Sequence, residues 1–305
     1  MSIVERVAWI AVDWGASKLQ IWAMDGAHDL LAERSLTQDM GGLECMQFES
    51  VLLQIIDEFL VAGRVMPVIC CGMVGAKHGW VEADYITAPS RPPSGACAMR
   101  VISNDARIDV RIVPGMKQVA QPDVMWGEET QVAGFLSEQP KFDGVLVMLG
   151  THSKWVHISA GEIVSFQTFI TGEIYALLAH QSVLKHSIAV TGWDDIAFEV
   201  ALAETISRPE SAAAKLFSLR AASLVGDQSA EVARARLSGL LIGLELAATR
   251  PYWLGQNLAV VAATNAGEIY AKALSLQGLQ AQVYDARLMM RRGLIAAYNT
   301  MKNTT

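Results

Sequence analysis

The chain has 305 residues, 52% of them hydrophobic and 18% charged, and its formal net charge is −7. This globular composition excludes intrinsic disorder and a small disulfide-stapled scaffold. The length fits two domains or one large domain, and the acidic balance argues against broad, nonspecific binding of nucleic acid. No apolar stretch approaches the ~20 residues of a membrane span, so we expect a cytoplasmic protein with no membrane partner.

The first half of the chain opens with a predicted β-hairpin. Residues 7–13 are an apolar run of strand formers that ends on an acid, and residues 18–25, after a glycine turn, place Leu19, Ile21 and Ala23 at every second position. Residues 72–108 have no clear period, and we interpret them as a long irregular region, which more often carries function than scaffold. Between these segments the patterns predict a strand near 29–35, a helix over 45–61 and a buried strand over 66–71.

The second half repeats this opening. Gly15 and Gly150 occupy matching turns 135 residues apart (150 − 15), and each is followed by small hydroxyl residues and a lysine. A repeat of this length indicates two similar halves rather than a solenoid. Strands that alternate with helices predict an α/β protein with mixed sheets flanked by helices. The expected elements are strands at 145–149, 154–159, 163–169, 258–262 and 280–284, and helices at 127–137, 172–184, 209–224, 229–248, 267–276 and from 285 onward.

The two glycine turns are the candidate phosphate-binding features. The sequence has no P-loop, no G-x-G-x-x-G and no H-E-x-x-H motif. In the first turn, residues 13–18 (DWGASK), backbone N–H groups can face a phosphate while Asp13 holds a hydrated Mg²⁺ ion. A plain hairpin turn is the alternative for one copy, but the second turn, residues 149–154 (LGTHSK), favours a nucleotide held by two related domains.

Four blocks of sequence, in this order, extend the pattern beyond the turns. In combination they resemble the 2-dehydro-3-deoxygalactonokinase family of the actin, sugar kinase and Hsp70 ATPase superfamily. The blocks are residues 72–83 (GMVGAKHGWVEA), 123–131 (DVMWGEETQ), 150–156 (GTHSKWV) and the stretch from Thr171-Gly172-Glu173 to Ala176-Leu177-Leu178.

This resemblance implies a fold and a reaction. The fold would be two related actin-like (ribonuclease H-like) ATPase domains with the active site in the interdomain cleft. Residues 1–140 would carry the sugar-acid loops, and residues 141–305 the nucleotide segment. The reaction would be transfer of the ATP γ-phosphate, with Mg²⁺, to the terminal hydroxyl of 2-dehydro-3-deoxy-D-galactonate, giving the 6-phospho product in galactonate catabolism.

The resemblance also suggests catalytic and phosphate-binding residues. Asp13 would contact Mg²⁺ through water, and either Glu128 or Glu129 would be the catalytic acid, because a Gly–Glu–Glu placement supplies it in related exopolyphosphatases. Acids favoured at a helix N-terminus by the macrodipole are the alternative reading of this pair. Adjacent helical residues point about 100° apart, so only one of the two would face the substrates. The phosphate-binding candidates are Gly15, Ser17 and Lys18 in the first turn, Gly150, Thr151 and Ser153 in the second, and Gly267 in the adenosine segment.

A sugar acid adds the demand for cationic or N–H groups to bind its carboxylate and ketone. Residues 72–118 contain 6 Lys+Arg against 4 Asp+Glu, and Lys77, His78 and Arg91 are the candidates there. Glu173, at the start of another predicted helix, is a candidate for the sugar hydroxyls, and the alternative is that it supplies the catalytic acid in place of Glu128 or Glu129. For each of the cations a solvated surface charge is the alternative.

The sequence leaves two other functions open. One is a phosphatase or exopolyphosphatase of the same superfamily, and the other is a nonenzymatic actin-like ATP-binding regulator. The sequence also leaves open a homodimer and the choice between the galactonate-derived and gluconate-derived 2-keto-3-deoxy acids, which differ at one hydroxyl.

Overall fold

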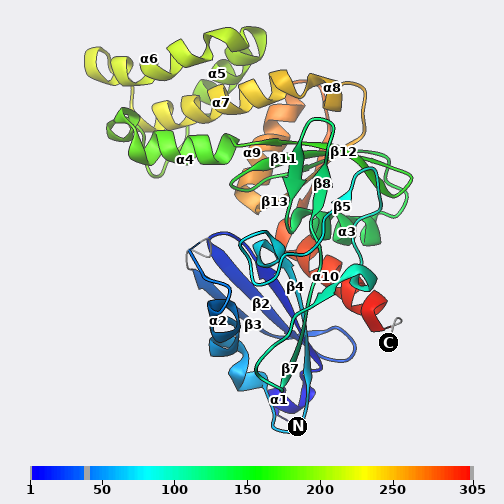
Figure 1. The fold of residues 1–305 in the computed structure, drawn as a ribbon. Coiled ribbons are helices and arrows are strands. Elements are labelled where there is room, and N and C mark those ends of the chain that lie inside the picture. Colours follow the sequence, from blue (N-terminus) through cyan, green and yellow to red (C-terminus); the bar gives the residue numbers. More distant parts are fainter. Residues whose placement is uncertain (1, 38–41, 303–305) are drawn as a thin grey trace. The chain divides into compact units, whose positions relative to one another are not determined.

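The computed structural model describes residues 2–37 and 42–302, and the chain divides into two compact units (Figure 1). Unit 1 comprises the described residues of 1–143, 158–165 and 286–305. Unit 2 comprises residues 144–157 and 166–285.

Unit 1 is built around a six-stranded mixed sheet with the order β3-β2-β1-β4-β7-β6. β1 pairs antiparallel with β2 and parallel with β4, which itself pairs parallel with β7, so β1, β4 and β7 end at the same edge. The predicted hairpin is confirmed, with Trp14 opposite Leu19. The strands are β1 (Trp9–Trp14), β2 (Lys18–Met24), β3 (Leu30–Thr37), β4 (Met66–Gly72), β6 (Met99–Arg100) and β7 (Ile108–Ile112).

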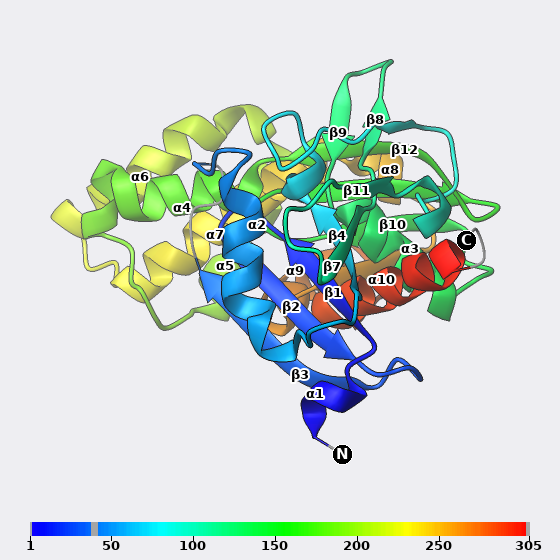
Figure 2. The ribbon, with the colours of Figure 1, turned by 60° about the horizontal axis from the view of Figure 1, so that its bottom comes forward.

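Helices cover both faces of this sheet. Successive residues of a strand point to opposite sides, so alternate residues of β1 contact different helices. Ile10 and Val12 of β1 belong to the core cluster that includes Phe48 of α2 (Gln47–Ile56). Trp9 and Ala11 belong to the cluster formed with α10 (Ala286–Lys302), whose Tyr298 ring stacks on Trp9 at 4.2 Å. α3 (Glu128–Glu138) packs along α10 (Figure 2).

The region predicted to be irregular, residues 72–108, contains only short elements. It also contributes β5 (Ile86–Thr87) to a small sheet of order β5-β8-β9, with β8 (Met116–Gln118) and β9 (Asp123–Met125). The other short elements of unit 1 are α1 (Ile3–Arg6) and single 3-10 turns at Asp57–Phe59, Met73–Gly75 and Gly95–Cys97.

The second large sheet has five strands in the order β12-β11-β10-β13-β14, and its topology repeats that of the six-stranded sheet. In both sheets a three-strand meander is followed by parallel strands, β4 and β7 in one and β13 and β14 in the other. This repeated topology agrees with the internal duplication inferred from Gly15 and Gly150. The strands are β10 (Gly144–Met148), β11 (Ser153–Ser159), β12 (Glu162–Phe169), β13 (Leu258–Ala262) and β14 (Ala281–Asp285).

The helices of unit 2 include one that the sequence patterns missed, α5 (Asp195–Ser207), which Asp194 caps by accepting the Ala197 N–H at 2.7 Å. α9 also begins at Thr264, three residues before the predicted start. The others are α4 (Thr171–Gln181), α6 (Ala212–Val225), α7 (Ala230–Ala248) and α8 (Arg250–Trp253), with 3-10 turns at Val183–His186 and Pro209–Ser211.

The unit boundaries differ from the proposed split at 140/141 in two respects. The change of unit at 143/144 lies close to it, but Ile158–Ser165 and α10 belong to unit 1. Its apolar residues, among them Met290 and Leu294, pack in the unit 1 core, and Gly293 and Gly134 let α10 and α3 approach so closely that a Cβ at either glycine would overlap backbone of the other helix.

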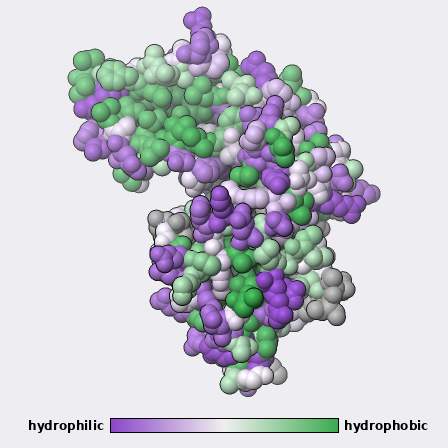
Figure 3. All heavy atoms as spheres, viewed as in Figure 1, coloured by the Kyte–Doolittle hydropathy of each residue, from purple (hydrophilic) through white to green (hydrophobic). Residues whose placement is uncertain are grey.

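The surface over the helices of unit 2 is rich in apolar side chains (Figure 3). Phe217, Leu224 and Val225 of α6 are 64%, 63% and 89% exposed. Among residues 2–37 and 42–302, none of the helices is both long and apolar enough to cross a bilayer.

Candidate active site

In unit 1 the candidate site lies at the edge where β1 and β4 end. The first turn closes tightly, because the Gly15 N–H donates to the Lys18 carbonyl at 3.0 Å. Asp13 is half-buried just before this turn, whereas Ser17 and Lys18 are exposed.

Two glycines bring the start of α3 to the same edge. A Cβ on Gly72, the last residue of β4, would lie 2.5 Å from the Trp14 carbonyl oxygen, and the residue has φ +94°. A Cβ on Gly127, directly before α3, would lie 3.5 Å from the Gly72 Cα. Glycine permits both the backbone conformation and the contact. The acids that open α3 therefore lie beside the end of β1.

The electrostatics of this edge raise the pKa of two acids, Asp13 and Glu129. Burial, then the charge of Glu128, raises the pKa of Asp13 to about 7, against the opposing effect of Lys18. Burial and Glu128 likewise raise the pKa of Glu129 to about 8. Glu129 is 0% exposed, and its carboxylate accepts from the Gly127 N–H at 2.8 and 2.9 Å and from the Thr130 hydroxyl at 3.0 Å.

Glu128 is half-buried and accepts the Trp126 N–H at 2.9 Å. The pair thus divides as expected for adjacent helical positions, with Glu129 turned inward and Glu128 remaining partly accessible. Asp13, Lys18, Glu128 and Glu129 are brought together by the fold.

The sugar-acid candidates fall into two places. Lys77 and His78 are exposed on the loop that leaves the end of β4, a tight loop in which the Trp80 N–H donates to the Val74 carbonyl at 2.9 Å. They emerge from the edge that carries Asp13. Arg91 instead lines a cavity of about 400 Å³ with Ser137 and Thr300. Ser137 lies nine residues along α3 from Glu128, about 13 Å at 1.5 Å per residue, so Arg91 belongs to the other end of that helix.

In unit 2 the second turn is fixed by the start of α4. Gly150, Thr151 and His152 are exposed. The Thr151 carbonyl accepts the Glu173 N–H at 2.9 Å, and His152 Nε2 lies 2.7 Å from Glu173 Oε2. Glu173, a candidate for sugar hydroxyls, therefore contacts the turn itself. The start of α4 holds this turn in place.

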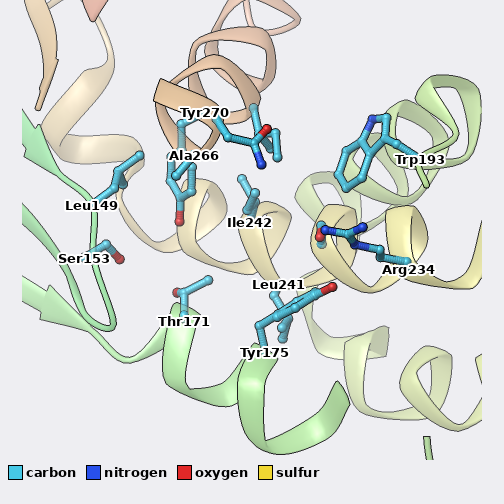
Figure 4. A pocket seen from close by; sticks show the side chains of 15 residues that line it. Leu149, Ser153, Thr171, Tyr175, Trp193, Arg234, Leu241, Ile242, Ala266 and Tyr270 are labelled. Carbon is cyan, nitrogen blue, oxygen red and sulfur yellow. The ribbon is translucent and has the colours of Figure 1, made fainter. Parts of the chain in front are cut away.

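A pocket of about 230 Å³ opens beside the second turn (Figure 4). Gly150 and Ser153 line it from the turn and β11, Thr171 and Tyr175 from α4, and Tyr270 from α9. Trp193 and Arg234 lie on the opposite side in Figure 4. An apolar pocket with a few polar groups next to a candidate phosphate-binding turn suits the adenosine of a nucleotide.

Two phosphate candidates have other contacts. The buried Ser153 hydroxyl donates to Glu245 at 2.7 Å, so its proton is not available to a phosphate. Gly267 is buried, and a Cβ there would lie 2.6 Å from Val283 Cγ1. It packs α9 against β14, while the neighbouring Asn265 and Ala266 line the pocket.

Glu245 is the functional candidate that sequence reasoning missed. It lies in α7, is 1% exposed, and accepts hydrogen bonds from Ser153, Trp155, Thr171 and Tyr270. The sequence did contain a sign of it, because Glu245 is the single acid within the apolar stretch Leu240–Leu246. An acid in such a stretch is expected to be buried, and buried carboxylates are paired or hydrogen-bonded.

The carboxylate oxygens at the β1 edge suit a magnesium ion. Mg²⁺ in kinases is held by one or two carboxylates, waters and substrate phosphates rather than by an all-protein cage. Asp13 provides one such carboxylate, in a place where the charge of Glu128 also acts on it. The described part of the chain contains no cluster of three or more His, Cys, Asp or Glu residues that could hold a metal ion.

The duplicated sheets and paired turns define a protein of the actin-like ATPase fold. Two solved structures with low identity share this fold. They are MreB 5 of Spiroplasma citri bound to AMPPNP (TM-score 0.50, 10% identity, 97% of each chain) and component A of (R)-2-hydroxyglutaryl-CoA dehydratase from Acidaminococcus fermentans (TM-score 0.50, 10% identity, 96% and 98%).

Within this class, a family model described as 2-keto-3-deoxy-galactonokinase matches residues 13–297, and the chain belongs to that family. A Rhizobium meliloti (strain 1021) protein named as a probable 2-dehydro-3-deoxygalactonokinase is 37% identical over 298 residues, covering 95% of this chain and 96% of the relative. The Escherichia coli (strain K12) 2-dehydro-3-deoxygalactonokinase is 31% identical over 274 residues, covering 88% and 90%. A crystal structure of a candidate 2-dehydro-3-deoxygalactonokinase from Sinorhizobium meliloti has a TM-score of 0.88, with 35% identity and 96% of each chain covered.

Proposed function

We propose that this protein transfers the γ-phosphoryl group of ATP to the terminal hydroxyl of 2-dehydro-3-deoxy-D-galactonate. The main support is that the chain matches the family model over residues 13–297. Two relatives named as 2-dehydro-3-deoxygalactonokinases, one of them as a probable one, are 37% and 31% identical to it. The acid cluster of unit 1 and the pocket of unit 2 support it, because they offer the two sets of groups that phosphoryl transfer needs. We place the reaction in the cytoplasm, where ATP is available to kinases.

Glu128 is the proposed general base. It is the partly accessible acid of its pair, whereas both oxygens of Glu129 are engaged by the Gly127 N–H. In the proposed step the acceptor oxygen bonds to the γ-phosphorus, the bond from that phosphorus to the β–γ bridging oxygen breaks, and the hydroxyl proton moves to Glu128. Positioning and charge neutralisation supply the rest of the rate enhancement.

Phosphate and metal contacts are assigned to the two turns. Gly15, Ser17 and Lys18 are proposed for one turn and Gly150 and Thr151 for the other, where all but Gly15 are exposed. Asp13 would hold Mg²⁺ through water. The ion would neutralise charge on the β- and γ-phosphates.

The sugar acid is assigned to the loop after β4. Lys77 and His78 are exposed there and are proposed to bind the substrate carboxylate. Arg91 lines a separate cavity and is the weaker candidate. A homodimer is also proposed, and the exposed apolar side chains Phe217, Leu224 and Val225 of α6 support it. Light scattering after size exclusion tests it.

The decisive experiment is a coupled assay of ADP release with 2-dehydro-3-deoxy-D-galactonate, its gluconate-derived epimer, the parent aldonic acids, and no acceptor. We expect release that depends on a 2-keto-3-deoxy acid and is fastest with the galactonate-derived epimer. ADP release only without acceptor would contradict the kinase, and phosphate release without any acceptor would favour a phosphatase. Nucleotide binding with no turnover of any acceptor would favour a regulator.

A further inference from the structure

The buried carboxylate of Glu245 joins four elements of unit 2. Glu245 comes from α7, and its partners come from β11 (Ser153 and Trp155), α4 (Thr171) and α9 (Tyr270). Glu245 Oε1 accepts Trp155 Nε1–H at 2.7 Å. Oε2 accepts the hydroxyls of Ser153 at 2.7 Å, Tyr270 at 3.0 Å and Thr171.

The three hydroxyl residues line the 230 Å³ pocket, while Glu245 lies behind them at 1% exposure. In Figure 4 their oxygen atoms converge on one corner of the pocket from three different elements. Burial, then the charge of Glu245, raises the pKa of Tyr270 well above its ordinary value, so the phenol stays protonated and donates. One carboxylate thus fixes the direction of every hydroxyl in that corner.

We infer that Glu245 is a positioning residue for nucleotide binding: it holds Ser153, Thr171 and Tyr270 so that the pocket keeps its shape before ATP enters. This inference rests on the proposed function, since it takes the pocket of unit 2 as the nucleotide pocket. Groups held in place before binding lose less conformational entropy when the ligand binds.

The donor inventory makes Glu245→Gln an informative change. Trp155 Nε1 can only donate, so the amide oxygen must replace Oε1 and the NH₂ group must face the three hydroxyls. An NH₂ group has two protons, so at most two of the three hydroxyls can accept from it, and each must reverse its own proton to do so. The variant therefore keeps the size of the side chain but no longer orients all three hydroxyl groups.

The test measures the dissociation constant for ATP by calorimetry, together with kcat and the KM for the sugar acid. For Glu245→Gln we expect ATP binding roughly 10-fold weaker, as for one lost hydrogen bond to a charged group, with the KM for the sugar acid changed less than about twofold. Tyr270→Phe and Thr171→Val each remove one donor. If Glu245 couples them, the double variant departs from additivity.

Thr205→Val is the matched control. Thr205 is 0% exposed in α5, which packs on α7, and its hydroxyl donates to the Ala201 carbonyl at 2.9 Å. This variant should lose thermal stability without changing ATP affinity.

The inference is overturned if Glu245→Gln lowers the melting temperature as Thr205→Val does but binds ATP as tightly as the wild type. Additive effects of Tyr270→Phe and Thr171→Val would overturn it even if Glu245→Gln does not fold. Failure of the wild-type protein to bind ATP would instead contradict the proposed function.

Discussion

Asp13, at the end of β1, and Glu128, at the start of α3, are close enough for the charge of one to affect the other: burial and Glu128 together raise the pKa of Asp13 to about 7. A cation would stabilise the charged form of Asp13, so we propose Asp13 for the cation and Glu128 for proton transfer.

We expect Glu128→Gln to lower kcat by at least ~100-fold, the usual minimum for loss of a general base, with little change in the KM for ATP. Glu129→Gln should keep most of the activity, because the Glu129 carboxylate is 0% exposed and is bound by Gly127 and Thr130. Steady-state kinetics of both variants decide the matter. Near-normal turnover of Glu128→Gln would remove it from the base role.

The activity of the wild type should depend on pH through Asp13. Its raised pKa of about 7 means that the ionised form, which binds a cation, accumulates as the pH rises from 6 to 8. At low Mg²⁺ concentration kcat/KM for ATP should therefore rise over this range. Higher Mg²⁺ concentration should move the midpoint to lower pH, because the cation binds the deprotonated ligand. A midpoint that does not respond to Mg²⁺ would argue against Asp13 as its contact.

Stability should fall with rising pH because of Glu129. A carboxyl whose folded pKa is about 8, against an ordinary 4.5, makes the folded state bind more protons than the unfolded state between those values. The unfolding free energy then decreases as the pH rises from about 4.5 to 8. Glu129→Gln should remove part of this slope and become more stable than the wild type at pH 8, by on the order of 1–3 kcal/mol.

Urea unfolding at pH 5 and pH 8 measures this effect, with the exposed Asp84→Asn as the control. If the unfolding free energies of the wild type and Glu129→Gln change by the same amount between pH 5 and pH 8, the prediction is wrong.

Gly293→Ala tests the assignment of α10 to unit 1. A Cβ at Gly293 would overlap the Thr130 carbonyl of α3, so we expect the unfolding free energy to fall by about 2–4 kcal/mol. Urea unfolding measures this loss, and the melting temperature should fall with it. Gly26→Ala is the control, because a Cβ there has no neighbour within 4 Å. Equal stability of the two variants would mean that the α3–α10 contact is looser than described.

Local patterns in the sequence were enough for several features. Alternation and glycine turns located both hairpins, and the equivalence of Gly15 and Gly150 indicated the duplication that the two sheets show. The 100° between adjacent helical residues also fits the different burial of Glu128, which is half-buried, and Glu129, which is 0% exposed. The hairpins and the helix geometry depend on residues near one another in the chain, and the duplication is a repeat visible in the sequence itself, so the sequence alone determines these features.

Other features depend on contacts between distant segments, and only the tertiary structure decided them. Glu245 acquires its role from Ser153, 92 residues away, and from Tyr270, and no local pattern encodes that meeting. The same holds for α10, whose place follows from its fit against α3 and Trp9. It also holds for Arg91, whose charge suited a sugar acid but whose position lies toward the end of α3 away from Glu128. Residue type sets the chemistry that a side chain can perform, while packing decides which partners it meets.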